Sequence, residues 1–300
     1  MKSKCVLIFL VVVWLFNMGK GIGCGSNVNV NAEMNIPLST WVWDTKKWML
    51  NQEAILEKLQ EKKVTNVYLQ IDTHLSPSVY RHFIQQAQAE GISVYALDGA
   101  PYWIGPSGIE EQEAFFNWIT VYQAEADEQQ QFSGVHLDVE PYLYKSWENN
   151  RVKSILQYQY VISQAAVQSH ELHLPLAVDI PFWFDEVPFK NSNGSGSLGR
   201  WVIQYADEVT IMAYRNHADQ ENGIAEITEN ERKWGRLLST PIEIGVETKA
   251  SDEGEYISFS AKGEEKMMQE LGMLLTECQA ENPPSSIAVH YFDSWLQMKP

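Results

Sequence analysis

Short apolar runs and longer amphipathic stretches alternate along the chain from residue 39 onward. The short runs are rich in β-branched and aromatic residues, a pattern typical of parallel strands joined by crossover helices. Eight runs have the length and composition of buried strands: residues 39–44, 65–71, 92–97, 133–140, 174–180, 208–213, 242–247 and 286–291. The pattern predicts a single (β/α)8 barrel, and an open α/β sheet with fewer strands is the alternative.

Several connecting segments have recognisable ends. Ser76 and Pro77 are expected to begin a helix that Gly91 ends. Little chain follows the eighth predicted strand, so the last barrel helix should be short, near residues 294–298, or missing.

Two further segments give local predictions. Thr228 and Glu231 form a capping-box pattern at the start of a helix. The stretch 188–199 is rich in glycine, asparagine and serine, which predicts a flexible loop.

The first 23 residues are organised like an export signal. Lys2 and Lys4 precede an apolar run over residues 5–16, which is too short for a membrane span. Gly23 followed by Cys24 resembles the bacterial lipoprotein signal, in which the cysteine becomes the lipidated first residue. Ordinary cleavage nearby, with Cys24 left as a free thiol, is the alternative.

The predicted organisation is therefore an export signal over residues 1–23, a flexible tether over 24–36 and a barrel domain over 37–300. The tether contains too little apolar surface to offset the entropy of ordering it. The protein should lie at the cell surface through a lipid on Cys24, or be secreted.

Composition narrows the expected partners. An apolar content of 45% can form one large core, and the formal net charge of −17 becomes more negative once the three lysines of the signal are removed. Such a surface repels polyanions, so nucleic acid is not an expected partner, whereas a neutral carbohydrate is compatible with it. Membrane contact would come only through the lipid. We expect a monomer without a cofactor.

Cysteine usage indicates that no disulfide framework supports the fold. The chain contains Cys5, Cys24 and Cys278, and the first leaves with the signal. Cys278 falls in a predicted helix, where we expect a small buried side chain.

Polar residues end most of the predicted strands, at the edge where barrels of this type carry their chemistry. Each acidic one has an ordinary alternative as a helix cap or a loop residue. The set is Asp44, Asp72, Asp98, Asp138, Glu140, Asp179, Tyr214 and Glu247.

The fourth strand carries the strongest candidate site. Because side chains alternate along a strand, Val135, Leu137 and Val139 should face the helices, and His136, Asp138 and Glu140 the barrel interior. The outer two of these interior residues attach to the backbone about 13 Å apart, which disfavours a metal site. Asp138 and Glu140, about 6.6 Å apart by the same rise, can share a proton, which raises the proton affinity of one carboxylate.

The segment Ser133–Glu140 resembles the fourth-strand signature D-G-x-D-x-D-x-E of family 18 glycoside hydrolases, the chitinases and endo-N-acetylglucosaminidases. Gly134, Asp138 and Glu140 match, whereas Ser133 and His136 replace two aspartates. The segment 211–214, Ile-Met-Ala-Tyr, is similar to the M-x-Y signature of the same family.

The resemblance implies hydrolysis of N-acetylglucosamine-containing glycans, in which the N-acetyl oxygen of the substrate attacks the anomeric carbon. Glu140 would protonate the leaving oxygen, and Asp138 would orient the acetamido group and stabilise the charged intermediate. Tyr214 would donate a hydrogen bond to the acetamido oxygen, and Met212 would line the pocket floor. His136 could hydrogen-bond Asp138 and, if cationic, would hold it ionised and shift the pH range of activity.

Aromatic residues near the strand ends are candidate sugar platforms, because an indole face covers the apolar side of a sugar ring. The candidates are Trp43, Trp103, Trp183 and Trp295, the last standing in for the Trp that usually ends the eighth strand in this family.

Two other functions remain open at this stage. Glu140 and Glu247 could be the acid and the nucleophile of a two-carboxylate retaining glycosidase. The barrel could also bind carbohydrate at the cell surface without cleaving it, a possibility that the replacements at Ser133 and His136 raise.

Overall fold

The computed structural model describes residues 36–278 and 282–300, and within these ranges eight parallel strands close into a barrel. Around the barrel the strand order is β1-β10-β9-β8-β5-β4-β3-β2. The barrel strands are β1 (Leu38–Val42), β2 (Asn66–Gln70), β3 (Ser93–Asp98), β4 (Gly134–Leu137), β5 (Leu176–Pro181), β8 (Glu208–Met212), β9 (Ile242–Glu247) and β10 (Ser286–His290). The predicted barrel and its eight strands are confirmed.

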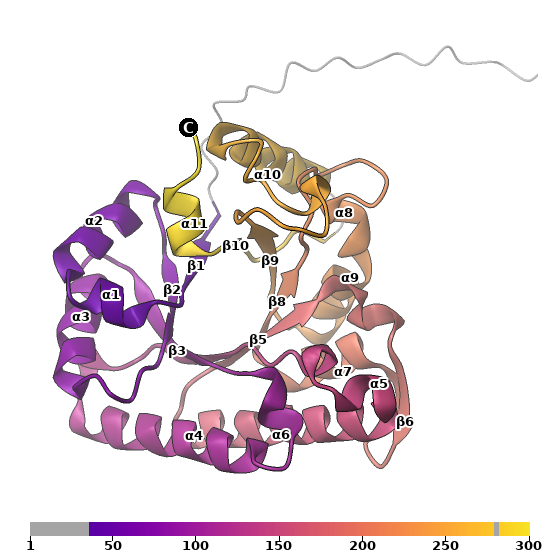
Figure 1. Ribbon diagram of the computed structural model, residues 1–300, viewed down its shortest axis with the longest axis horizontal. Helices are drawn as coiled ribbons and strands as arrows, with labels where there is room; N and C mark the ends of the chain where they lie inside the picture. The colour runs from indigo at the N-terminus through magenta and orange to yellow at the C-terminus, as the bar shows by residue number, and fades with distance from the viewer. Residues whose placement is uncertain (1–35, 279–281) are drawn as a thin grey trace, which may run out of the picture. The chain divides into compact units, whose positions relative to one another are not determined.

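Helices surround the closed sheet (Figure 1). They are α1 (Thr45–Met49), α2 (Gln52–Glu61), α3 (Pro77–Ala89), α4 (Gly108–Glu125), α5 (Ser146–Asn149), α6 (Arg151–Glu171), α7 (Leu198–Tyr205), α8 (Ile224–Ile227), α9 (Glu229–Leu238), α10 (Glu264–Cys278) and α11 (Phe292–Leu296). The last helix is short, as predicted. Among the described residues, no helix has both the length and the apolar character needed to cross a bilayer.

Local signals predicted the ends of α3 correctly. The Ser76 side chain accepts a hydrogen bond from Ser78 N, and Pro77 is the first helical residue. Gly91 follows the helix with φ of +75°, a conformation that favours glycine. Cys278 is buried at the end of α10, again as predicted. The predicted export signal and Cys24 lie outside the described residues and stay predictions.

The stretch 188–199 is not the flexible loop that we predicted. It contains an antiparallel hairpin of β6 (Pro188–Asn191) and β7 (Gly194–Ser197), followed by the start of α7. Gln159 of α6 accepts hydrogen bonds from the amides of Asn191 (2.8 Å) and Asn193 (3.1 Å). Side-chain contacts with α6 therefore order a segment whose composition alone indicates a loop.

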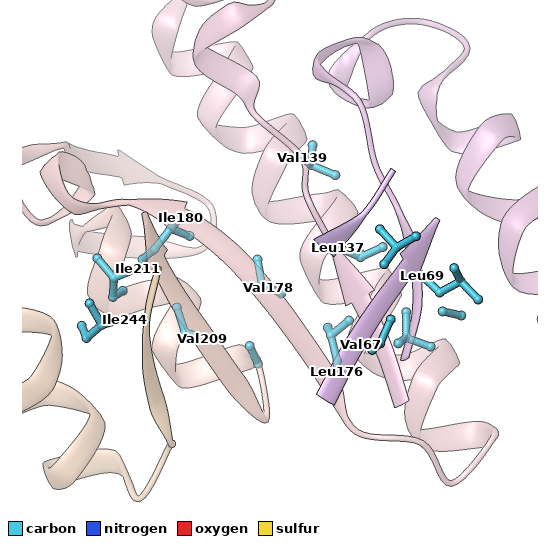
Figure 2. Close-up of a cluster of buried hydrophobic side chains, with 14 of the residues drawn as sticks. Val67, Leu69, Leu137, Val139, Leu176, Val178, Ile180, Val209, Ile211 and Ile244 are labelled. Atoms are coloured by element: carbon cyan, nitrogen blue, oxygen red, sulfur yellow. The ribbon is translucent and has the colours of Figure 1, made fainter. Parts of the chain in front are cut away.

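The main core lies between the barrel and the helices. Figure 2 shows aliphatic side chains of neighbouring strands, including Leu137, Val178 and Ile211, in this buried layer. Val135 and Val139 belong to it as well, which confirms the predicted alternation along the fourth strand.

A buried carboxyl group joins five strands in the lower part of the barrel interior, which is the part near the amino ends of the strands. Glu243 Oε1 accepts hydrogen bonds from the hydroxyls of Ser39 (2.6 Å) and Ser286 (2.9 Å). Its Oε2 accepts from the hydroxyls of Tyr68 and Thr210, both at 2.7 Å. Four donors compensate the removal of this group from water, so the lower interior is closed by a satisfied polar network.

The capping box predicted at Thr228 and Glu231 does not form. The Thr228 hydroxyl donates to Ile224 O and accepts from Arg232 Nε instead. Glu231 is fully buried, and neither of its carboxyl oxygens has a hydrogen-bond partner among the described residues. Burial raises the pKa of Glu231 to about 8.

This buried acid should make stability depend on pH. Because its folded-state pKa lies above the ordinary 4.5, the contribution of Glu231 to stability is fully present below pH 4.5 and is lost as the pH rises toward 8. In Glu231→Gln the free energy of unfolding should fall by on the order of 3 to 5 kcal/mol less over this pH range than in the parent. Urea unfolding at pH 5 and pH 9 would measure it, with Glu229→Gln, an exposed residue of the same helix, as the control. The prediction would be contradicted if the free energy of unfolding changed equally between pH 5 and pH 9 in the parent and in Glu231→Gln.

Candidate active site

The middle of the barrel interior is built around His136 and Asp179. His136 Nε2 lies 2.8 Å from Asp179 Oδ1, although the groups are not aligned as a hydrogen bond, and Trp41 Nε1 donates to Asp179 Oδ2 at 3.0 Å. The Tyr68 ring stacks on the imidazole with centroids 3.7 Å apart. Burial lowers the pKa of His136 to about 3, so the imidazole is neutral. His136 therefore contacts Asp179 as a neutral ring and does not act as a cation beside Asp138.

Asp138 and Asp179 are neighbours on the inner wall. In the parallel pair β4–β5, Leu137 lies opposite Val178, and the next residue of each chain segment is one of these acids. Burial first, and then the Asp179 and Glu140 carboxylates, raise the pKa of Asp138 well above its ordinary value. Burial likewise raises the pKa of Asp179. Each has a buried Oδ1 without a hydrogen-bond partner among the described residues, so the pair is suited to holding one proton.

Two glycines allow the backbone to place this wall. A Cβ on Gly134 would lie 2.3 Å from the ring of Tyr95, which fills the interior beside it. Gly99 has φ of +145°, and a Cβ there would lie 2.3 Å from the backbone oxygen of Asp138. Asp138 N donates to Asp98 O at 3.1 Å, so the exit of β3 fixes the backbone of Asp138.

Glu140 follows β4 at the start of the short 3-10 helix η3 (Pro141–Leu143). The Tyr142 hydroxyl donates a hydrogen bond to Glu140 Oε1. Tyr142 packs edge-on against Trp183, with ring centroids 5.0 Å apart, and both are partly buried. Glu140 is thus held by Tyr142, and its predicted coupling to Asp138 is electrostatic.

Met212 and Tyr214 lie at the end of β8, at the same opening of the barrel as Asp138 and Glu140, which follow β4. Met212 is 8% exposed, and Tyr214 is partly buried. Burial and then the Glu247 and Asp138 carboxylates raise the pKa of Tyr214 well above its ordinary value, which keeps its hydroxyl a hydrogen-bond donor.

A hollow of about 780 Å³ lies at the ends of β1, β9 and β10, and the ring of His290 in its wall is 5.8 Å from the ring of Tyr214. Trp43, Glu247 and His290 line it and form a chain. Trp43 Nε1 donates to His290 Nε2 at 3.2 Å, and His290 Nδ1 lies 2.9 Å from Glu247 Oε2. Glu247 Oε1 also accepts from the backbone N–H groups of Thr248 (2.8 Å) and Lys249 (2.7 Å).

Two of the predicted sugar platforms do not reach the opening. Trp103 is 2% exposed and packs against Phe115 in the core. Trp295 is 1% exposed, and its indole donates to Glu264 Oε1 at 2.9 Å. Their burial contradicts the predicted sugar contacts of both, because position after a strand does not fix the direction of a side chain.

Two strand-end acids have the ordinary roles that the sequence left open. Asp44 caps α1 by accepting from Lys47 N at 3.1 Å. Asp72 accepts from His74 N at 2.9 Å in an exposed turn.

The sequence reasoning named Asp179 among the strand-end acids without giving it a role, and it did not include His290 and Tyr142 among the site residues. Asp179 has a readable signal, because it is an acid on an otherwise apolar strand with the same inward parity as Ala177, which lies opposite His136. His290 and Tyr142 carry no comparable signal, since their roles depend on contacts with Trp43, Glu247 and Glu140.

The sequence matches no protein-family model and no curated protein. Among solved structures, the spore cortex-lytic enzyme SleL of Bacillus megaterium QM B1551 matches with a TM-score of 0.51 at 12% identity, over 87% of this chain and 73% of that one. A chitinase from Bacteroides thetaiotaomicron matches with a TM-score of 0.50 at 10% identity, over 86% of this chain and 90% of that one. At such identities the likeness concerns the fold: this chain has the parallel barrel of these two proteins.

Proposed function

We propose that the protein is a glycoside hydrolase that cleaves N-acetylglucosamine-containing glycans by a substrate-assisted, retaining reaction. The observation that carries the proposal is the pair Asp138 and Glu140 at the carboxyl end of β4 in a barrel, with Tyr214 at the end of β8 beside His290, which lines a hollow. Two proteins with this fold are named a chitinase and a spore cortex-lytic enzyme, which supports a glycan as substrate.

In the first step the acetamido oxygen of the substrate attacks the anomeric carbon, and the glycosidic C–O bond breaks. Glu140 gives its proton to the leaving oxygen, and Tyr142, donating to Glu140 Oε1, orients the carboxyl group. In the second step a water attacks the same carbon and gives a proton to Glu140, which opens the ring of the intermediate and retains the anomeric configuration.

Asp138 would accept a hydrogen bond from the acetamido N–H and oppose the positive charge of the intermediate. Its raised pKa means that burial and a charged Asp179 both oppose its ionisation. Asp138 would therefore carry the charge only while Asp179 holds the proton of the pair. Tyr214, whose raised pKa keeps the hydroxyl protonated, would donate to the acetamido oxygen.

The contacts of Glu247 weigh against the two-carboxylate alternative. Both of its oxygens are engaged, one by two backbone N–H groups and the other by His290. A carboxylate that attacks the anomeric carbon gives electron density to the new bond, which weakens every hydrogen bond that it accepts. These contacts favour a supporting role for Glu247.

Incubation with tetra-N-acetylchitotetraose, followed by ¹H NMR of the first products, tests the proposal. We expect shorter N-acetylated oligomers that first appear as the anomer of the original linkage, with cello-oligosaccharides of the same length left intact. Cleavage of the cello-oligosaccharides would favour the two-carboxylate reaction, because they have no acetamido group. Binding of the chitotetraose without any product would favour the non-catalytic carbohydrate-binding barrel.

A further inference from the structure

The chain Glu247–His290–Trp43 defines the protonation state of His290. An indole N–H can only donate, so His290 Nε2 must offer a lone pair to Trp43. The ring hydrogen then lies on Nδ1 and is donated to Glu247 Oε2, 2.9 Å away. Two backbone N–H groups hold the other oxygen of Glu247, which fixes the carboxylate that selects this tautomer.

The chain ends on an aromatic wall of the hollow. Trp43 is partly buried and packs against the inner cluster that contains Trp41 and Tyr68, while it also lines the hollow. The His290 side chain is 21% exposed and the Glu247 side chain 12%, so the link between carboxylate and indole is largely shielded from water. A shielded hydrogen bond is worth more than an exposed one, so it can restrain the indole.

We infer that Glu247 and His290 are positioning residues that hold the Trp43 indole as one wall of a sugar subsite, and that protonation of His290 releases it. The inference rests on the proposed function for the identity of the ligand, a sugar ring. It does not require that Glu247 or His290 touch the reacting atoms.

The charged surroundings of His290 determine the direction of the pH effect. Inside the barrel it faces Asp138, Asp179 and the ring of Tyr214, and along the hollow it shares walls with Asp44, Lys249 and Asp293. Burial lowers the pKa of His290, but the hydrogen bond that it donates to Glu247 and the nearby carboxylates outweigh this and raise it above 6.5. As the pH falls through that raised value, Nε2 gains a proton and the Trp43 contact is lost, so KM should rise toward acid pH.

Glu247→Gln is the sharpest test, because it reverses the tautomer with almost no change in shape. The backbone donors at Thr248 and Lys249 require the amide oxygen, so the amide NH₂ must face His290 Nδ1. The ring hydrogen would then move to Nε2, directly against the Trp43 N–H. Asp207→Asn is the matched control, since Asp207 forms a 2.8 Å pair with His170 before β8, at the other end of the strands.

Three measurements separate the outcomes. ¹⁵N NMR of the histidine rings and the indole N–H signal of Trp43 report the chain without any ligand. Titration with tetra-N-acetylchitotetraose in a Glu140→Gln background measures how tightly the subsite with the Trp43 wall binds the sugar. Steady-state kinetics of the otherwise unaltered enzyme give kcat and KM. We expect Glu247→Gln to move the ring hydrogen, to weaken binding about tenfold with kcat within about twofold, and to abolish the acid rise in KM. Asp207→Asn should change none of these.

Trp43→Phe keeps an aromatic wall and removes the donor, so Glu247→Gln should have no further effect on binding in that background. An unchanged tautomer, or the same loss of binding with Phe at position 43, would overturn the inference. So would a loss of kcat of about a thousandfold with unaltered affinity, which would make Glu247 a catalytic residue. If the unaltered protein binds no oligosaccharide, the proposed function fails. The NMR signals would still show whether Glu247, His290 and Trp43 are joined by hydrogen bonds.

Discussion

Glu140→Gln is expected to lower kcat on tetra-N-acetylchitotetraose by about 10³-fold, with little change in KM. The amide keeps the shape of the side chain and can still meet the Tyr142 hydroxyl, but it has no proton to give to the leaving oxygen. An aryl N-acetylglucosaminide whose phenol is already acidic needs less protonation, so the loss in its first step should be much smaller. Initial rates of product release on the two substrates measure the difference.

The control for this variant is Glu148→Gln, an exposed residue of α5 a short distance along the chain. It should retain the parental rate, and thermal unfolding should be alike for both variants. Equal losses on both substrates would argue against Glu140 as the acid, because the loss would then not follow the demand of the leaving group for a proton. Full activity of Glu140→Gln would exclude the proposed mechanism.

Asp138→Asn should lower kcat by about 10² to 10³-fold, because an amide cannot oppose the positive charge of the intermediate. Asp179→Asn should be more active than Asp138→Asn, and its pH profile should be displaced from that of the parent. The Asp179 carboxylate raises the pKa of Asp138, so its removal lowers that pKa, and the acid limb of kcat/KM should move to lower pH. Rates measured between pH 3 and pH 9 test both statements.

Asp72→Asn serves as the matched control for these two variants, because Asp72 also follows a strand but lies in an exposed turn with His74. Its profile should coincide with that of the parent. An acid limb that stays in place in Asp179→Asn would mean that Asp138 and Asp179 do not share a proton. The site would then have to keep Asp138 ionised in another way, with His290 as the remaining positive influence on it.

Much of the barrel could be predicted from local patterns. Each of the eight strands is a short run whose apolar side chains have to be buried. Alternation places Asp138 inside the barrel because Leu137 and Val139 pack in the core between the barrel and the helices. The hairpin at 188–199 was missed because its order comes from Gln159, which lies in a different helix. A sequence window cannot contain such a partner.

The amino-acid sequence determined by itself the barrel and the inward parity of His136 and Asp138, because these follow from periodicities of two and of about four residues. Only the tertiary structure decided which groups meet inside. It places His136 against Asp179 of the neighbouring strand, joins Trp43 to Glu247 through His290, and buries Trp103 and Trp295 away from the opening. Such pairings depend on the register between strands and on side-chain direction, neither of which is encoded within a single run of residues.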